Sequence, residues 1–200
     1  MSIIRAFIAI DLSKEICQNL EKVIRDLKEG MGGASVRWIP AKNIHLTIKF
    51  LGDVSVVNLG LLINVIQSEV NRHPSFDLSV GGLGTFPSTR RPRVIWVGVK
   101  APVELDALHH SVETEMARLG YVPEDRPFSP HLTLGRVARN VNTEELRRIS
   151  DTMSNTKVGF LGATHIDAVH LYRSDLQPGG AVYSRLFTAS LINAEAQKTL

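Results

Sequence analysis

Two short segments of the sequence carry the same residue types in the same order: His45-Leu46-Thr47-Ile48 and, 86 residues later, His131-Leu132-Thr133-Leu134. Apolar and polar residues alternate in each segment, and this alternation predicts a β-strand. Residues i and i+2 of a strand lie on one face, so each histidine shares a face with its threonine while the aliphatic residues point the other way. We infer a duplicated unit that brings two imidazoles together.

A pair of histidines suits acid–base chemistry on a phosphate ester. Imidazole titrates near neutral pH, so one ring can be neutral while the other is protonated. In-line attack on a phosphodiester needs a base for the nucleophile and an acid for the leaving oxygen. We expect His45 and His131 to flank the phosphorus atom, with the hydroxyls of Thr47 and Thr133 beside its non-bridging oxygens. Such a site requires neither a metal ion nor a cofactor.

Strand and helix signals surround the two segments in the same order, namely strand, helix, histidine strand, helix and strand. Besides the second histidine strand, strands are expected over residues 3–11, 36–39, 44–51, 76–86, 94–99, 165–172 and 183–191, and helices over 13–30, 56–70, 102–120 and 142–153. Ser13 is a good N-cap, and Asn142 with Glu145 forms a capping box. A turn is expected at Gly52-Asp53.

This alternation predicts an α+β fold of two pseudo-symmetric, split-βαβ-like lobes, with antiparallel sheets facing a central cleft and helices outside. We expect one bilobal domain over residues 1–200, with lobes of about 1–90 and 91–200 and the option that terminal strands are exchanged between them. Clefts between lobes are common ligand sites.

The composition is that of an ordinary globular protein, with 44% hydrophobic and 22% charged residues and a mean hydropathy of +0.02. No apolar run approaches the length of a membrane span, and residues 1–11 resemble a first strand more than a signal peptide, so we expect a cytoplasmic protein without membrane contact. Cys17 is the only cysteine, which excludes an internal disulfide and a thiolate metal cluster. A net charge of +3 and a pI of about 9.2 favour a polyanionic partner.

Further segments extend the pattern around the two motifs. They are RAFIAI at 5–10, NIHLTIKFLGD at 43–53, FP at 86–87, RVIWVG at 93–98, FSPHLTLGR at 128–136 and LYRSDL at 171–176, followed by Gly180 and Tyr183. In these residues the chain closely resembles the two-histidine (2H) phosphoesterases, and within them the RNA 2′,3′-cyclic phosphodiesterases related to the bacterial 2′-5′ RNA ligase. The resemblance covers nearly the whole chain.

The resemblance implies an enzyme that opens a terminal 2′,3′-cyclic phosphate on RNA ends, such as those of tRNA fragments, and leaves a 2′-phosphomonoester. It also raises the option of the reverse reaction, in which RNA ends are joined through a 2′-5′ bond. It implies His45 as proton donor and His131 as proton acceptor, with exchanged roles in the reverse direction, and Arg136 as a phosphate- or RNA-binding residue. Arg136 has the wrong strand parity to share the face of His131, so we expect a bulge or a strand end next to Gly135. We expect a monomer.

Strand parity makes two further predictions after the first histidine. Lys49 should share the face of His45 and Thr47, where it lines the phosphate cleft, with a solvated edge lysine as the alternative. Phe50 should lie on the opposite face, in the core. Trp38 and Trp96 could stack on a base, although a core position is expected for Trp96. The roles of Tyr172 and Tyr183 are left undecided. For the remaining histidines we expect structural or surface roles; they are His73, His109, His110, His165 and His170.

Other functions are weighed against the leading one. Asp53 with the two motif histidines could bind zinc, but no third ligand has a recognisable spacing. Arg90, Arg91 and Arg93 could contact an RNA backbone, although a solvated loop is the commoner explanation. A catalytically idle protein that binds RNA ends is a second hypothesis, and an enzyme acting on small cyclic nucleotides or 2′-5′ oligoadenylate is a third.

Overall fold

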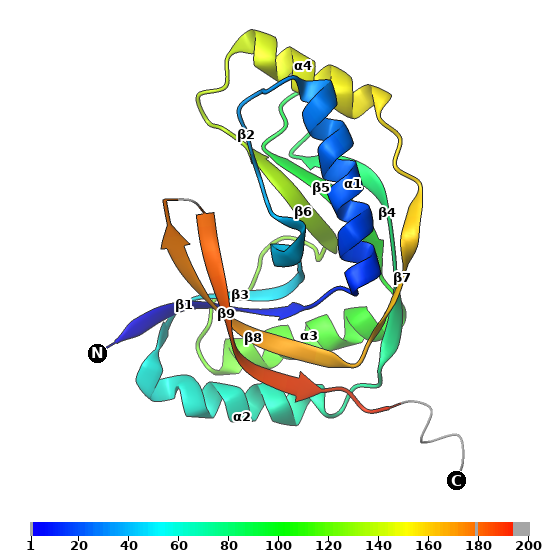
Figure 1. Ribbon diagram of the computed structural model, residues 1–200. Coiled ribbons are helices and arrows are strands. Elements are labelled where there is room, and N and C mark those ends of the chain that lie inside the picture. Colours follow the sequence, from blue (N-terminus) through cyan, green and yellow to red (C-terminus); the bar gives the residue numbers. More distant parts are fainter. Residues whose placement is uncertain (1, 179, 194–200) are drawn as a thin grey trace.

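The computed structural model describes residues 2–178 and 180–193, which form two antiparallel sheets with helices packed around them (Figure 1). The strands are β1 Ile3–Ile10, β2 Val36–Trp38, β3 Leu46–Ser55, β4 Phe76–Phe86, β5 Val94–Lys100, β6 His131–Val137, β7 Phe160–Ile166, β8 Ala168–Gln177 and β9 Gly180–Ser190. The α-helices are α1 Lys14–Met31, α2 Leu59–Val70, α3 Val103–Arg118 and α4 Thr143–Asn155. Sheet A has the strand order β3-β1-β8-β9, and sheet B has the order β2-β6-β5-β4-β7.

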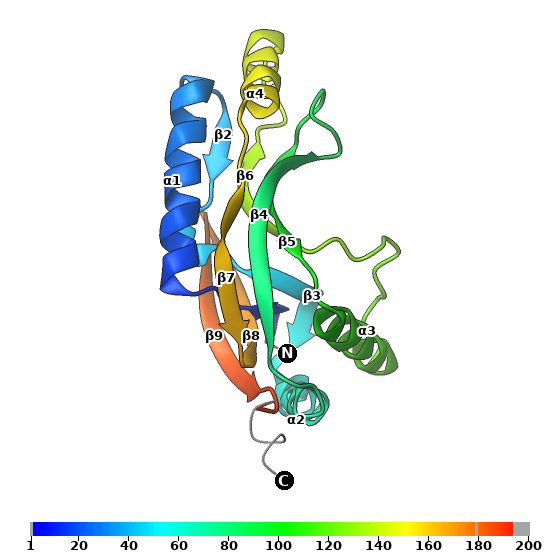
Figure 2. The same cartoon turned by 90° about the vertical axis from the view of Figure 1, so that its right-hand side faces the viewer.

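Local signals explain where the helices begin and end. The Ser13 hydroxyl accepts a hydrogen bond from the Ile16 backbone N–H at the start of α1, and Gly32 ends this helix with a left-handed φ of +54°. Asn142 and Glu145 form the expected capping box of α4. The helices lie on the outer sides of the sheets: α1 packs against β7, α4 packs against α1, and α2 and α3 cover sheet A (Figures 1 and 2).

The predicted α+β class with two antiparallel sheets and outer helices is confirmed. The four strands of sheet A, in the order β3-β1-β8-β9, correspond to the strands β6-β5-β4-β7 of sheet B. Sheet B has one further strand, β2, which lies beside β6. Each sheet takes strands from both halves of the sequence, since β8 and β9 join β1 and β3 while β2 and β4 join the strands of the second half. The two histidine motifs therefore lie at corresponding places in different sheets.

Two boundary predictions are wrong. The strand expected over 165–172 is two strands, because the chain leaves sheet B at the end of β7 and enters sheet A at the start of β8, with Asp167 between them. The expected turn at Gly52-Asp53 lies inside β3, which continues to Ser55 opposite β1. Gly52 has a φ of +67° and sits at a register shift, so its backbone produces an irregularity in the strand rather than its end.

Candidate active site

His45 directly precedes β3 and lies among aromatic rings. It stacks on Phe7 with 4.7 Å between centroids and meets Tyr183 edge-on at 5.2 Å. Its Nδ1 is 3.0 Å from the backbone oxygen of Asn43. A carbonyl oxygen can only accept, so Nδ1 carries the proton of the neutral ring and Nε2 is left to exchange protons with a ligand.

His131 opens β6 and repeats this arrangement. Its Nδ1 is 2.7 Å from the backbone oxygen of Ser129, and its ring meets Phe86 edge-on at 5.0 Å and lies 6.2 Å from Trp96. In both motifs the carbonyl two residues before the histidine thus fixes the ring and its tautomer. Strands β3 and β6 approach within 8 Å between Cα atoms, which places the two motifs on neighbouring strands of the two sheets.

The threonines of the two motifs occupy corresponding positions. Thr47 lies opposite Ala9 of β1, and Thr133 lies opposite Trp96 of β5. Both side chains are half-buried, and neither hydroxyl has a hydrogen-bond partner within residues 2–178 and 180–193. Both hydroxyls are therefore available to a bound anion.

A β-bulge follows the threonine in the first motif. Thr47 lies opposite Ala9 but Lys49 lies opposite Ile8, so Ile48 is an extra residue in β3. A bulge reverses the face on which later side chains lie. The parity predictions for Lys49 and Phe50 are therefore both wrong: Lys49 turns into the core, and Phe50 is 65% exposed beside Phe7, with 6.2 Å between ring centroids.

The second motif carries the same bulge. Thr133 lies opposite Trp96 but Gly135 lies opposite Ile95, which leaves Leu134 as the extra residue. Of the two expectations for this position, a bulge or a strand end next to Gly135, the structure has the bulge, and it brings the exposed side chain of Arg136 to the face of Thr133.

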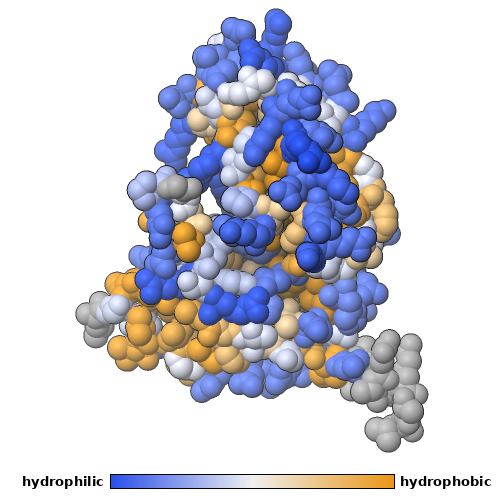
Figure 3. Space-filling model, viewed as in Figure 1, coloured by the Kyte–Doolittle hydropathy of each residue, from blue (hydrophilic) through white to orange (hydrophobic). Residues whose placement is uncertain are grey.

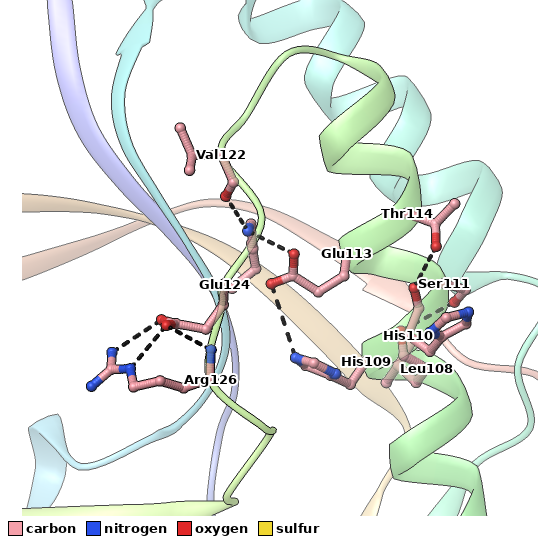
Figure 4. A network of polar contacts seen from close by, with 10 residues as sticks. Leu108, His109, His110, Ser111, Glu113, Thr114, Val122, Glu124 and Arg126 are labelled. Atoms are coloured by element: carbon pink, nitrogen blue, oxygen red, sulfur yellow. Dashed lines mark hydrogen bonds and ion pairs between the residues drawn. The ribbon is translucent and has the colours of Figure 1, made fainter.

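Lys49 is buried and hydrogen-bonded within the protein, and it does not line the cleft. It is 4% exposed, and its Nζ donates 2.7 Å hydrogen bonds to Glu113 Oε2 of α3 and to the backbone oxygen of Val122. Figure 4 labels both acceptor residues, Glu113 on α3 and Val122 on the segment that follows it. Val122 belongs to the segment that leads from α3 to His131. One buried ammonium therefore connects the strand of the first motif to the segment that precedes the second.

A polar cluster lies beside His45 and was not predicted. The Tyr172 hydroxyl donates to the two carboxylate oxygens of Asp11 at 2.8 and 2.9 Å, and Arg185 pairs with the same carboxylate and donates to the Tyr172 oxygen at 3.2 Å. A cavity of about 390 Å³ joins this cluster to His45; Tyr183, Lys42 and Asn43 also line it. Figure 3 shows a gap in the surface below the part of the molecule that carries β2.

The surroundings of His45 also set its charge. Burial lowers the pKa of His45 below its ordinary value, and the Asn43 carbonyl and the Asp11 carboxylate oppose this effect. The ring is therefore biased toward its neutral form until an anion binds beside it.

The remaining candidates have structural partners. Trp96 is half-buried, contacts Phe86 at 5.1 Å and covers Gly84, where a Cβ atom would lie 2.2 Å from the indole ring. Trp38 lines a separate cavity of about 420 Å³ beside α1. The structural roles expected for four of the other histidines agree with their contacts: His73 with Ser111, His109 with Phe128, His165 with Asp77 and His170 with Thr188.

Two other kinds of feature, a cluster of metal ligands and a membrane-spanning helix, are absent from the described residues. Within the described part of the chain, no three His, Cys, Asp or Glu side chains are grouped as ligands of a metal ion. In the same residues, no helix has the length and apolar character needed to cross a membrane.

Comparison with known proteins identifies the family. The model of the family described as LigT like Phosphoesterase matches this chain twice, over residues 10–96 and 97–183. The chain belongs to this family. Each match contains one of the two histidine motifs, and the resemblance to the 2H phosphoesterases is confirmed at the level of the family.

Relatives and solved structures of LigT-like phosphoesterases cover nearly all of the chain. An RNA 2′,3′-cyclic phosphodiesterase of Methanothermobacter thermautotrophicus is 34% identical over 181 residues, which are 90% of this chain and 95% of the relative. One from Thermotoga maritima is 30% identical over 184 residues, which are 92% of this chain and 93% of the relative. The crystal structure of E. coli LigT complexed with 3′-AMP is 28% identical, with a TM-score of 0.75 over 95% of this chain and 99% of that one.

Proposed function

We propose that this protein hydrolyses the terminal 2′,3′-cyclic phosphate of RNA to a 2′-phosphomonoester, with His45 and His131 as its acid–base pair. The observation that carries the proposal is the matched hydrogen bond in the two motifs, which leaves Nε2 of each ring free to exchange a proton. The activity is the one named for relatives that cover about nine-tenths of this chain.

The reaction requires one proton to be taken and one to be given. A water oxygen attacks the phosphorus atom as its proton passes to Nε2 of His131, and the P–O3′ bond breaks as Nε2–H of His45 protonates the 3′ oxygen. The Thr47 and Thr133 hydroxyls donate to the non-bridging oxygens, and Arg136 adds positive charge on the same face as Thr133. When a 5′-hydroxyl takes the place of water, the same proton transfers with the same roles break the P–O3′ bond and form a 2′-5′ bond. The two histidines exchange roles when that bond is cleaved, since the 3′ oxygen then attacks the phosphorus atom and the 5′ oxygen leaves.

The lowered pKa of His45 links substrate binding to the donor role. In the free protein, burial favours the neutral ring. A phosphodiester carries a negative charge, and an opposite charge within a few ångströms favours the imidazolium form. Binding of the substrate therefore favours the protonated form of His45, which is the proton donor, while His131 of the other motif accepts a proton.

An oligonucleotide that ends in a 2′,3′-cyclic phosphate tests the proposal, incubated with the protein in the presence of EDTA. We expect the ring to open and the phosphate to remain on the 2′ oxygen, as determined by ³¹P NMR. His45→Ala and His131→Ala should each abolish turnover with little loss of stability, whereas His110→Ala, an exposed residue of α3, should retain it.

The outcomes separate the alternatives. Binding without ring opening by the intact protein would favour the idle RNA-end binding protein, and turnover of 2′,3′-cyclic mononucleotides or 2′-5′ oligoadenylate in preference to RNA would favour the small-molecule enzyme. Near-full activity of either histidine variant would overturn the mechanism. All the proposed catalytic groups come from one chain, which is compatible with the predicted monomer; that state and a cytoplasmic location stay predictions.

A further inference from the structure

The carbonyl group that orients His131 lies in a segment without helix or strand. Residues 119–130 connect α3 to β6, and Ser129 supplies the backbone oxygen that lies 2.7 Å from His131 Nδ1. In the first motif the matching carbonyl belongs to Asn43, the last residue of a short 3-10 helix, Ala41–Asn43, that is closed by a backbone hydrogen bond. The first carbonyl is therefore fixed by local structure, whereas the second depends on contacts with other parts of the protein.

Phe128 is the side chain that anchors this segment next to Ser129. The side chains of residues 122–127 are exposed, whereas Phe128 is half-buried and packs against the core. In the part of the chain that the structure describes, the backbone of residues 123–128 has no hydrogen bond to a helix or strand. Because Phe128 and Ser129 are adjacent, a movement of the Phe128 ring moves the Ser129 carbonyl.

The ring of Phe128 stacks on His109 of α3. The two ring centroids are 3.8 Å apart, and the ring planes are within 10° of parallel. The His109 side chain is 17% exposed. Burial lowers the pKa of His109 below its ordinary value, and the Glu113 carboxylate opposes this effect, so the stacked ring is biased toward its neutral form. A flat ring fixes the plane of its stacking partner, which an aliphatic side chain does not.

Glu113 connects this stack to the strand of the first motif. Its Oε1 lies 4.0 Å from His109 Nε2 (Figure 4), and its Oε2 accepts the hydrogen bond from Lys49 of β3. His109 is therefore linked to β3 through Glu113 and to the segment that precedes the second motif through Phe128.

We propose that His109 is a positioning residue for His131, and that its stack with Phe128 holds the Ser129 carbonyl in place as the acceptor for His131 Nδ1–H. A backbone oxygen at Nδ1 selects the tautomer of a neutral histidine and leaves Nε2 for the ligand. The proposal rests on the proposed function for the reaction in which His131 takes part. It adds to that function a residue of α3 that acts only through its neighbours.

Three variants test the role of the stack. His109→Leu keeps apolar bulk and removes the flat ring, His109→Phe restores a flat ring, and His110→Leu is the matched control at the exposed next residue of α3. The substrate is an oligonucleotide that ends in a 2′,3′-cyclic phosphate. We expect His109→Leu to lower kcat about tenfold to a hundredfold with KM within about twofold, because a misplaced reacting group slows the chemical step. His109→Phe should recover most of the rate, and the control should match the unmodified chain.

The tautomer of His131 gives a second readout, which a purely structural role of His109 would leave unchanged. In protein labelled with ¹⁵N-histidine, long-range ¹H–¹⁵N spectra at alkaline pH distinguish the two neutral tautomers, and the His131→Ala variant assigns the signals. We expect the Nδ1–H form of His131 in the unmodified chain, in His109→Phe and in the control. In His109→Leu we expect a mixture of both tautomers. His45 should keep one tautomer throughout, since its acceptor carbonyl lies in the 3-10 helix.

The two proposals fail in different ways. An unchanged kcat or an unchanged His131 tautomer in His109→Leu would overturn the positioning role, and so would a His109→Phe variant that is as impaired as His109→Leu. A raised KM at unchanged kcat would overturn it too. If His109→Leu does not fold, as measured by circular dichroism, Phe128→Leu takes its place with the same expected results. If the intact protein opens no cyclic phosphate, the proposed function fails, and the His131 tautomer alone decides the positioning role.

Discussion

His45 and His131 have different neighbours, although the ring of each makes the same hydrogen bond to a backbone oxygen. His45 lies between Phe7 and Tyr183 and close to the Asp11 carboxylate, whereas His131 is bordered by Phe86 and Trp96. Identical hydrogen bonds make either ring able to give or take a proton, and we propose that the different neighbours decide which ring is the donor. The Asp11 carboxylate is the neighbour whose effect on His45 can be tested.

Replacement of Asp11 by Asn should move the pH profile. The carboxylate raises the pKa of His45 against the effect of burial, so its removal lowers that pKa further. A proton donor must be protonated in the free enzyme, and kcat/KM falls as the pH rises through its pKa. We expect the alkaline limb of kcat/KM against pH to shift to lower pH in Asp11→Asn and to stay in place in Asp11→Glu. An unmoved or upward-shifted limb would contradict the donor role of His45.

The motif threonines should contribute through their hydroxyls alone. Thr47→Val or Thr133→Val keeps the side-chain shape and removes a donor to the phosphate oxygens, and loss of one such donor costs about 2.7–4 kcal/mol, or about 10²–10³ in kcat. Thr→Ser at the same positions should recover most of the rate. Single-turnover kinetics measure the loss, and a valine variant with unchanged kcat would remove that threonine from the transition state.

At the scale of elements, the buried Lys49–Glu113 pair joins β3 to α3. The side chains are 3% and 16% exposed. Lys49→Met removes one charge and leaves the Glu113 carboxylate buried without it, and breaking a buried pair in this way costs about 3–5 kcal/mol. We expect urea unfolding to show that loss, and we expect the double variant Lys49→Met with Glu113→Gln to recover part of it. A cost below about 1 kcal/mol for Lys49→Met would mean that the pair contributes little.

The bulges also limit which side-chain positions could be predicted from the sequence. The repeated histidine and threonine positions could be predicted because two residues of unbroken strand set their common face. Beyond the threonine, period-two parity failed for Lys49 and Phe50, since nothing in Thr47-Ile48-Lys49 signals an extra residue. Next to Arg136 either a bulge or a strand end was expected, because Gly135 tolerates irregular backbone and a basic residue was expected in the cleft; the structure has the bulge. The cluster at Asp11, Tyr172 and Arg185 could not be found, because Asp11 directly follows β1 while Tyr172 and Arg185 belong to β8 and β9, and these strands meet only in the folded sheet.

For the whole molecule, one buried and two half-buried histidines, His170, His45 and His109, predict an acid-sensitive fold. Burial is the largest cause that lowers the pKa of His45, His109 and His170. The unfolded chain, with ordinary pKa values of about 6.5, therefore binds more protons than the folded chain in the window below that value. The free energy of unfolding should fall as the pH drops from 8 through 6.5 to 5. Urea titrations measure this slope, and His170→Asn should reduce it; stability that is flat or greater at pH 5 would contradict the prediction.

The interleaving of the two sheets has a consequence for the origin of the chain. β4 leaves the first half to pair with β5, and β8 leaves the second half to pair with β1. A single ancestral repeat with this path could not complete a sheet by itself, since its strand equivalent to β4 and β8 pairs with the other repeat. Two separate copies could close both sheets only as a homodimer with swapped strands, so this ancestor would have worked as a pair before a fusion made the pairing permanent.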